Sequence, residues 1–307
     1  MSKRVESTPF TRYETFLVAI LAILQFTIVL DFMVLSPMGA ILLKELDIKP
    51  VQFGLVVSAY AFSAGASGLL AAGFADKFDR KKLLLFFYTG FVAGTIMCAM
   101  APNYKLLLIA RIITGLFGGV ISSISFAIIT DVFRMEVRGR VMGFVQMAFA
   151  VSQVLGIPVG LLLANKYDWH APFWLIAVFA AIVGIIILIY MKPVTGHLRA
   201  QLKLNPLEHL WKTLSKGEYL RGFLVTTLLA TGGFMLMPFS SAFTVNNQGI
   251  SIDYLPLIYI VTGVFSIVTG PVIGKLSDIV CKNKVFFSGT HHSIIMVGIF
   301  TNIGINT

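Results

Sequence analysis

Charged residues are scarce in this chain. Asp, Glu, Lys and Arg make up only 12% of its 307 residues, whereas a soluble domain contains about 25%. Hydrophobic residues account for 57% of the sequence, and its mean hydropathy is +0.87. This shortage of charge argues against a soluble protein and places the chain among membrane proteins.

Cysteine is nearly absent, with only Cys98 and Cys281. Cys98 lies near the end of an apolar run, and Cys281 lies in a loop that we predict on the opposite side of the membrane. A disulfide requires two Cα atoms within about 7 Å, but the hydrocarbon core of a bilayer is about 30 Å thick. We therefore expect two free thiols.

The sequence also lacks the residue patterns of an enzyme. It has no nucleophile–base pair, no phosphate-binding loop and no metal-ligand spacing, since the adjacent His291 and His292 supply too few ligands. We therefore predict no enzymatic activity, no cofactor and no metal site. The net charge of +10 does not indicate nucleic-acid binding either, because the cations sit in short clusters between apolar runs.

Long apolar runs are the main feature that is present. A transmembrane helix needs about 20 mostly apolar residues, and we predict eight such helices, with polar residues weakening a ninth at 285–305. The eight predicted helices are 15–43, 52–75, 83–101, 106–130, 140–163, 172–190, 220–243 and 254–276.

The distribution of Lys and Arg predicts the orientation. With a cytoplasmic N-terminus, 19 of the 24 cations fall in cytoplasmic segments, 4 fall in outer segments, and Arg111 lies inside a run. Lys and Arg concentrate in the cytoplasmic loops of membrane proteins. We therefore expect a multi-pass protein of a bacterial-type inner (cell) membrane with its N-terminus in the cytoplasm.

The longest polar connection, 191–219, predicts a division of the chain. It contains Pro193, Gly196 and Pro206, and we interpret it as a cytoplasmic linker between an N-terminal six-helix half, 1–190, and a partial C-terminal half, 220–307. Within it, 204–214 fits a short amphipathic helix on the inner membrane surface. A solvated basic loop fits the same residues equally well.

Two loops repeat one pattern. Residues 72–81 read AGFADKFDRK and residues 274–283 read GKLSDIVCKN. Each places an Asp, Asp76 or Asp278, at the cytoplasmic end of a run, with a cation four residues later. Internal repeats are typical of secondary transporters, and this one indicates two parallel halves.

The first of these loops resembles the G-x-L-x-D-R-x-G-R-K signature of the major facilitator superfamily. Ala72 and Asp79 stand where that signature has glycine. Its matching residues are Asp76, Lys77, Arg80 and Lys81.

Three further motifs resemble the same family. RIITGLFGG at 111–119 is similar to its R-x-x-x-G-x-x-G motif, which is associated with proton coupling. Asp131 with the RGR of 138–140 is similar to its D…R-G-R pattern. GIPVG at 156–160 is similar to the G-x-P-x-G antiporter motif of drug and metabolite efflux members. Over residues 15–285 the chain therefore resembles the bacterial twelve-helix drug/metabolite:proton antiporters.

The resemblance implies a fold. It implies an all-α integral membrane protein with a major facilitator-type bundle, its first six-helix half complete and two to three helices of the second half present. Since such transporters have twelve helices, about 100 further residues are expected. The chain is then either a fragment or a natural truncation.

The resemblance also implies a function. It implies secondary active transport, with proton-coupled efflux of small lipophilic or amphiphilic molecules by alternating access. A sugar or metabolite carrier on the same scaffold is one alternative, and a truncated membrane protein that does not transport is another. The expected partners are a small-molecule substrate, protons and the lipid bilayer, and a monomer is expected.

Asp31 is a carboxylate near the middle of the first predicted helix. An ionised group at that depth is costly and is by default functional. We hypothesise that it binds and releases the coupling proton, and that Arg111 reaches it directly or through water in one conformation and withdraws in the other. The alternatives are a packing role for Asp31 and an Arg111 side chain that extends to the outer surface.

Two other groups of residues are candidates for conformational roles. At the inner face, Asp76, Arg80, Asp131 and Asp278 match the family's cytoplasmic latch, in which ion pairs hold one state; incidental acids in a basic loop are the alternative. In the fifth predicted helix, Gly156, Pro158 and Gly160 predict a hinge or a leak-proof seam, because Pro kinks a helix and Gly allows close helix packing. A kink without a gating role is the alternative.

Polar, aromatic and Met side chains predict a substrate cavity, because aromatic and Met groups form adaptable apolar pockets. Core or lipid-facing positions are the alternative for each. The candidates are Gln25, Phe32, Met33, Gln146, Phe149, Ser152, Gln153, Phe234, Met235 and Met237.

Overall fold

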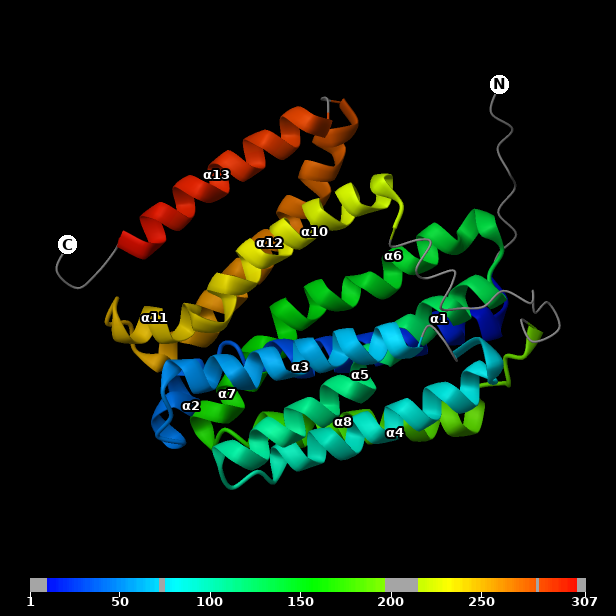
Figure 1. Cartoon of the computed structure of the whole chain (residues 1–307), viewed down its shortest axis with the longest axis horizontal. Helices are drawn as coiled ribbons and strands as arrows, with labels where there is room; N and C mark the ends of the chain where they lie inside the picture. Colours follow the sequence, from blue (N-terminus) through cyan, green and yellow to red (C-terminus); the bar gives the residue numbers. More distant parts are fainter. Residues whose placement is uncertain (1–9, 72–74, 197–214, 280–281, 303–307) are drawn as a thin grey trace.

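The computed structural model describes residues 10–71, 75–196, 215–279 and 282–302, and every regular element among them is a helix (Figure 1). The predicted all-helical architecture is confirmed. Seven helical segments in the described ranges are long and apolar enough to cross a membrane.

The helices fall before and after the predicted linker. Those before it are α1 (Arg12–Val34), α2 (Gly39–Glu45), α3 (Pro50–Ala71), α4 (Arg80–Ala99), α5 (Tyr104–Val132), α6 (Met135–Val151), α7 (Ile157–Lys166) and α8 (Ala171–Tyr190). Those described after it are α10 (Gly217–Leu236), α11 (Ser240–Asn246), α12 (Leu255–Ile279) and α13 (Lys282–Asn302).

The first predicted helix, 15–43, is wrong in its outer part. The chain turns at residues 35–38, and α2 is a separate short helix. The cause is Pro37, since the residue before a proline is disfavoured in the helical conformation and proline has no N–H to donate. Asp31 therefore lies in the last turn of α1 and not near the middle of a long helix.

Two other predicted helices contain irregular segments. The run 140–163 begins earlier, at Met135, and a π-helical segment, Ser152–Gly156, separates α6 from α7. The run 220–243 passes through a 3-10 turn at Met237–Phe239, around Pro238, before α11. The predicted amphipathic helix at 204–214 lies outside the described residues.

Two hydrophobic clusters form the interior of the first group of helices. The cluster toward the predicted cytoplasmic end, here called the inner cluster, includes Leu21, Phe91 and Ile121. The cluster toward the opposite end, here called the outer cluster, includes Phe53 and Leu161. Helix α1 contributes to both clusters and is the most buried of the membrane-length helices. It is therefore the central helix, against which α6, α7 and α8 pack, and its side chains bond to α4 and α5.

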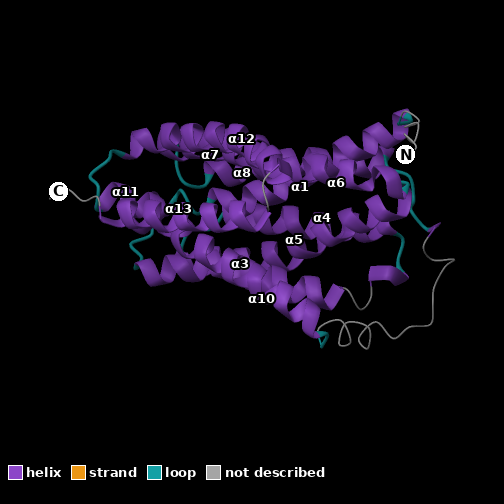
Figure 2. Cartoon of the chain, turned by 90° about the horizontal axis from the view of Figure 1, so that it is seen from above, coloured by secondary structure: helices purple, strands orange, loops and turns teal. Residues whose placement is uncertain are grey.

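The second group of helices contacts the first mainly at one end. In Figure 1, α10 and α12 converge on the first group where α2 and α11 lie, and they diverge toward the opposite end. Ser241 Oγ donates to the carbonyl oxygen of Ser36 at 3.2 Å, and the Phe53 and Phe239 rings lie 6.1 Å apart. Helix α12 also packs along α7 and the π-helical segment (Figure 2). The contacts between the groups thus form a seam at the end that we predict to be extracytoplasmic.

Candidate functional site

A fully buried ion pair joins α1 to α5. Arg111 Nη1 donates to Asp31 Oδ2 at 2.7 Å and to the Asp31 carbonyl oxygen at 3.1 Å, and neither side chain is exposed. Thr95 Oγ1 of α4 donates to Asp31 Oδ1 at 3.3 Å. The two residues expected to pair are therefore in direct contact, and the Arg111 side chain does not extend to the surface.

The rest of the Arg111 side chain is held by a ring. Its guanidinium carbon lies 4.5 Å from the ring centroid of Tyr60, on α3. Among the described residues, its Nε and Nη2 have no hydrogen-bond acceptor. Because two buried charges repay their desolvation only when they are well paired, loss of the Asp31 charge would leave a poorly compensated cation in the interior.

A cavity of about 220 Å³ lies beside this pair, between α1, α3, α5 and α6. Its wall is mainly apolar, and its polar groups include Gln25 and Ser122, whose Oγ donates to Gln25 Oε1 at 3.2 Å. The cavity is lined by Gln25, Ile28, Val29, Phe32, Tyr60, Ala61, Ala64, Gly118, Gly119, Ser122 and Phe149.

The predicted cavity residues are only partly brought together. Gln25, Phe32 and Phe149 line the cavity, and Phe234 of α10 reaches its edge, with its ring 5.7 Å from that of Phe32. The other candidates lie elsewhere. Met33 and Ser152 are buried, Met237 packs against the outer cluster, Gln153 is half-buried, and Gln146 and Met235 are exposed.

Sequence reasoning missed Tyr60 and Ser122 in this cavity. Tyr60 is an aromatic residue in an ordinary apolar run, and the pattern of that run gives no sign of its contact with Arg111. Ser122 lies eleven residues after Arg111, which is three turns along α5 on the same face. That spacing is the signal that could have placed Ser122 beside the cavity.

A second ion pair lies at the end that we predict to be cytoplasmic. Arg80 Nε lies 3.0 Å from Asp131 Oδ2, and Arg80 Nη1 donates to the Ala75 carbonyl oxygen at 3.1 Å. The pair connects the loop after α3 to the end of α5. The side chains of Asp76 and Asp278 lie outside the described residues, so the other half of the predicted latch is not placed.

Asp79, which stands where the family signature has glycine, has two roles of its own. Its Oδ1 caps α4 by accepting from Lys81 N at 2.8 Å, and it also accepts from Val194 N at 3.2 Å. Arg80 N donates back to the Val194 carbonyl oxygen at 3.2 Å. Asp79 thus ties the start of the predicted linker to the signature loop. Asp is a preferred N-cap residue, so its position directly before Arg80 could have predicted that Asp79 caps α4.

The glycines of the predicted hinge allow α1 to approach closely. A Cβ at Gly156 would lie 2.5 Å from Leu30 Cδ1, and one at Gly160 would lie 2.6 Å from Val34 Cγ2. The π-helical segment ends at Gly156, two residues before Pro158, and such π-bulges are frequent at functional sites. These residues pack as a seam against α1; whether they also act as a hinge stays a prediction.

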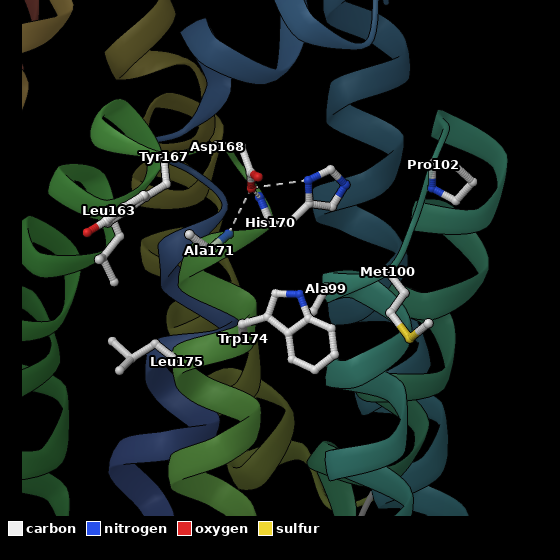
Figure 3. A pocket seen from close by; sticks show the side chains of 10 residues that line it. All are labelled: Ala99, Met100, Pro102, Leu163, Tyr167, Asp168, His170, Ala171, Trp174 and Leu175. Carbon is white, nitrogen blue, oxygen red and sulfur yellow. Dashed lines mark hydrogen bonds and ion pairs between the residues drawn. The ribbon is translucent and has the colours of Figure 1, made fainter.

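A wider, open pocket of about 670 Å³ lies at the start of α8 (Figure 3). Asp168 caps α8 by accepting from His170 N and Ala171 N at 2.7 and 3.1 Å. The His170 ring lies between Asp168 Oδ1, 3.2 Å from Nδ1, and the Ala101 carbonyl oxygen, 3.0 Å from Nε2. Capping and loop docking account for these contacts, so this pocket is not our candidate site.

The thiols and histidines form no metal centre among the described residues. Cys98 is buried and free, and Cys281 lies outside the described ranges. His291 and His292 are exposed on α13. Where side chains are described, no group of three His, Cys, Asp or Glu residues is placed to hold a metal ion.

Comparison with known sequences gives one family and several relatives. The family model described as Major Facilitator Superfamily matches residues 21–305. The chain is 24% identical over 234 residues to a probable sugar efflux transporter of Helicobacter pylori strain G27, covering 76% of this chain and 58% of that protein. It is 24% identical over 268 residues to the uncharacterized MFS-type transporter YceJ of Bacillus subtilis strain 168, covering 86% of this chain and 67% of that protein. The chain therefore spans about three fifths to two thirds of these relatives.

Comparison with solved structures gives the same fold. A bacterial homolog of the human lysosomal transporter Spinster, in an inward-facing and unoccupied conformation, matches with a TM-score of 0.72 at 16% identity, covering 90% of this chain and 64% of that one. A D-xylose–proton symporter matches with a TM-score of 0.67 at 17% identity, covering 87% of this chain and 69% of that one. At these identities the likeness establishes the fold alone.

Proposed function

The chain belongs to the major facilitator superfamily, whose members are membrane transporters and not enzymes, and from this premise we propose that it exports small lipophilic or amphiphilic molecules in exchange for protons. The observation that carries the proposal is the buried Asp31–Arg111 ion pair, which lies beside a mainly apolar cavity. A buried carboxylate that can lose its partner is suited to bind a proton.

The chemistry of the pair supports competition between proton and substrate. When Asp31 is ionised, Arg111 is neutralised. When Asp31 is protonated, Arg111 is an unpaired cation next to the cavity, and it disfavours a neutral or cationic lipophilic molecule there. Proton binding and occupation of the cavity by such a molecule therefore oppose each other, which is the thermodynamic requirement for exchange.

The position of the seam supports alternating access. The two groups of helices meet at the end that we predict to be outside and diverge toward the basic, cytoplasmic end. This arrangement corresponds to a state open to the cytoplasm, in which an exporter would load its substrate. We propose that a single chain is the transporting unit, with its N-terminus in the cytoplasm of a bacterial-type cell.

A sugar carrier is the second candidate, because four relatives are called probable sugar efflux transporters. A sugar presents several hydroxyl groups, and a site that selects it needs several polar partners. The wall of the present cavity is largely apolar, with Gln25, Ser122 and the Tyr60 hydroxyl as its polar groups. This composition favours a lipophilic substrate, and a substrate panel separates the two.

The proposal is tested in inside-out membrane vesicles that contain the protein. The lumen is made acidic, so that protons leave as substrate enters, and the reversed gradient is the control. Uptake of ethidium, chloramphenicol and arabinose is measured for the wild type and for Asp31→Asn. Gradient-dependent uptake of ethidium or chloramphenicol that is lost in Asp31→Asn supports proton-coupled export. Uptake of arabinose alone would favour the sugar carrier, and uptake by Arg111→Lys with unchanged pH dependence would remove the ion pair from the mechanism.

A further inference from the structure

Tyr60 contacts both parts of the proposed site. Its ring faces the Arg111 guanidinium, 4.5 Å from centroid to Cζ. The same side chain lines the cavity, where its ring lies 5.3 Å from that of Phe32. Tyr60 is therefore the wall between the ion pair and the space in which a substrate would bind.

Two glycines of the 111–119 motif, Gly115 and Gly118, pack directly against Tyr60. A Cβ at Gly115 would lie 2.5 Å from the Tyr60 carbonyl oxygen, and one at Gly118 would lie 2.6 Å from the Tyr60 hydroxyl. Any larger residue at these two positions would displace Tyr60. One motif thus supplies both the cation and the room for the ring that covers it.

Aromatic contacts extend from Tyr60 to the second group of helices. Phe32 follows Asp31 directly in α1 and packs between Tyr60 and Phe234 of α10, with ring centroids 5.3 and 5.7 Å apart. The row therefore connects α10 with the ion pair through three aromatic rings.

We propose that Tyr60 couples occupation of the cavity to proton binding at Asp31, and that the substrates are planar aromatic compounds that stack against Phe32 and Tyr60. This inference rests on the proposed function. When a substrate stacks on Tyr60, the ring moves relative to Arg111, whose Nε and Nη2 have no hydrogen-bond partner among the described residues. The charge of Arg111 then depends more strongly on the ionised Asp31 carboxylate, so that substrate binding favours release of the proton.

The electrostatic surroundings of Tyr60 are simple. The titratable groups that act on it are Asp31 of α1, Arg111 of α5 and Cys98 of α4. The Cys98 thiol is buried. Asp31 is the group that contacts Arg111 at 2.7 Å, so its protonation is what a movement of Tyr60 over Arg111 would affect.

The test measures ethidium affinity of the purified protein as a function of pH. Competition with one proton predicts that the wild-type Kd rises by about tenfold per pH unit on the acidic side. Tyr60→Leu removes the ring, and we expect its Kd to lose this pH dependence. Tyr60→Phe retains the aromatic ring, and its Kd should retain the pH dependence. Phe32→Leu is the matched control, since Phe32 lines the cavity without covering Arg111; it should weaken binding at all pH values and leave the pH slope intact.

The outcomes separate the two proposals. If the wild type binds ethidium with a pH-independent Kd, or does not bind it, proton exchange and the role of Tyr60 are both wrong. If the wild type shows the slope and Tyr60→Leu keeps it, the role of Tyr60 alone is wrong. The same holds if Phe32→Leu loses the slope as completely as Tyr60→Leu, because a general disturbance of the cavity would then explain both variants.

Discussion

One nitrogen of Arg111 makes two hydrogen bonds to Asp31: Nη1 donates to the carboxylate at 2.7 Å and to the backbone carbonyl of the same residue at 3.1 Å. Only the first of these bonds depends on the charge of Asp31. The carbonyl keeps Arg111 in place when the carboxylate takes up a proton. The pair can therefore re-form after deprotonation without a large movement of the arginine.

Removing only the carboxylate should be more harmful than removing both charges. Asp31→Asn leaves Arg111 buried without a counter-charge, at a cost of about 3–5 kcal/mol. The double variant Asp31→Asn/Arg111→Met removes the charge as well and should recover most of this loss. Thermal unfolding in detergent, followed by Trp fluorescence, measures both. An unfolding midpoint of Asp31→Asn equal to that of the wild type would contradict this account of the pair.

Glycine at the seam between the two groups of helices should tolerate no side chain. A Cβ at Gly263 of α12 would lie 2.9 Å from the backbone Cα of Val154 in the π-helical segment. Backbone cannot move aside as a flexible side chain can, so Gly263→Ala should lower stability by about 1–3 kcal/mol, as overpacking does. Gly143→Ala in α6 is the control, since a Cβ there meets nothing within 4 Å. Equal unfolding midpoints for the two variants would argue against a tight seam.

A lysine at position 80 should not preserve the function of Arg80. The guanidinium contacts Asp131 through Nε and the Ala75 carbonyl through Nη1, and a lysine ammonium cannot reproduce this forked geometry. We expect Arg80→Lys to lower transport almost as far as Arg80→Ala at equal abundance in the membrane. Lys82→Arg, in the same first turn of α4, serves as the control. Full transport by Arg80→Lys would reduce the role of Arg80 to its charge.

The hydrogen bond to Asp79 should stabilise the backbone at the start of the predicted linker. In Asp79→Gly, which restores the glycine of the family signature, α4 loses its cap and Val194 N loses its acceptor. We expect deuterium exchange at residues 191–196 to be faster in this variant by at least about fivefold, as loss of a bond worth about 1 kcal/mol implies. Asp79→Asn keeps an oxygen acceptor and should exchange as the wild type does. Unchanged exchange in Asp79→Gly would show that other contacts fix this segment.

The predicted orientation can be tested with single cysteines in a Cys281→Ser background, because Cys98 is buried. Lys166→Cys lies at the predicted outer end of α7, and Gly196→Cys lies after α8 in an uncrowded position. An impermeant maleimide added to intact spheroplasts should label the first and not the second. The reverse pattern would invert the topology.

The fold could be predicted from the sequence because membrane helices are recognised by their length and hydropathy. Each predicted run corresponds to a helix or to helices in series. The errors lie at prolines. Pro37 ends α1 early, Pro238 breaks the run that follows the linker, and a π-helical segment precedes Pro158. Hydropathy does not detect these breaks, since the residues on both sides are equally apolar.

The site was less predictable than the fold. Asp31 and Arg111 stand out because charge is rare in apolar runs, and their direct contact could not be derived because it depends on where α1 ends. The cavity residues were harder still. Met33 and Met235 have the same chemistry, but one is buried and the other is exposed, because the face that a helix residue occupies is decided by packing between helices. Tyr60 became visible only through its contacts in space.

The seam at the outer end also has a mechanical consequence. Helix α12 has 25 residues, so it is about 37 Å long at 1.5 Å per residue. If the seam acts as a fulcrum, each degree of rotation displaces the far end of this lever by roughly 0.6 Å, from the same length. Movements at the fulcrum that are smaller than a bond length would then be amplified into an opening wide enough for a drug-sized molecule. The tight contact of Gly263 with Val154 beside the pivot limits sliding of the two helix groups against each other.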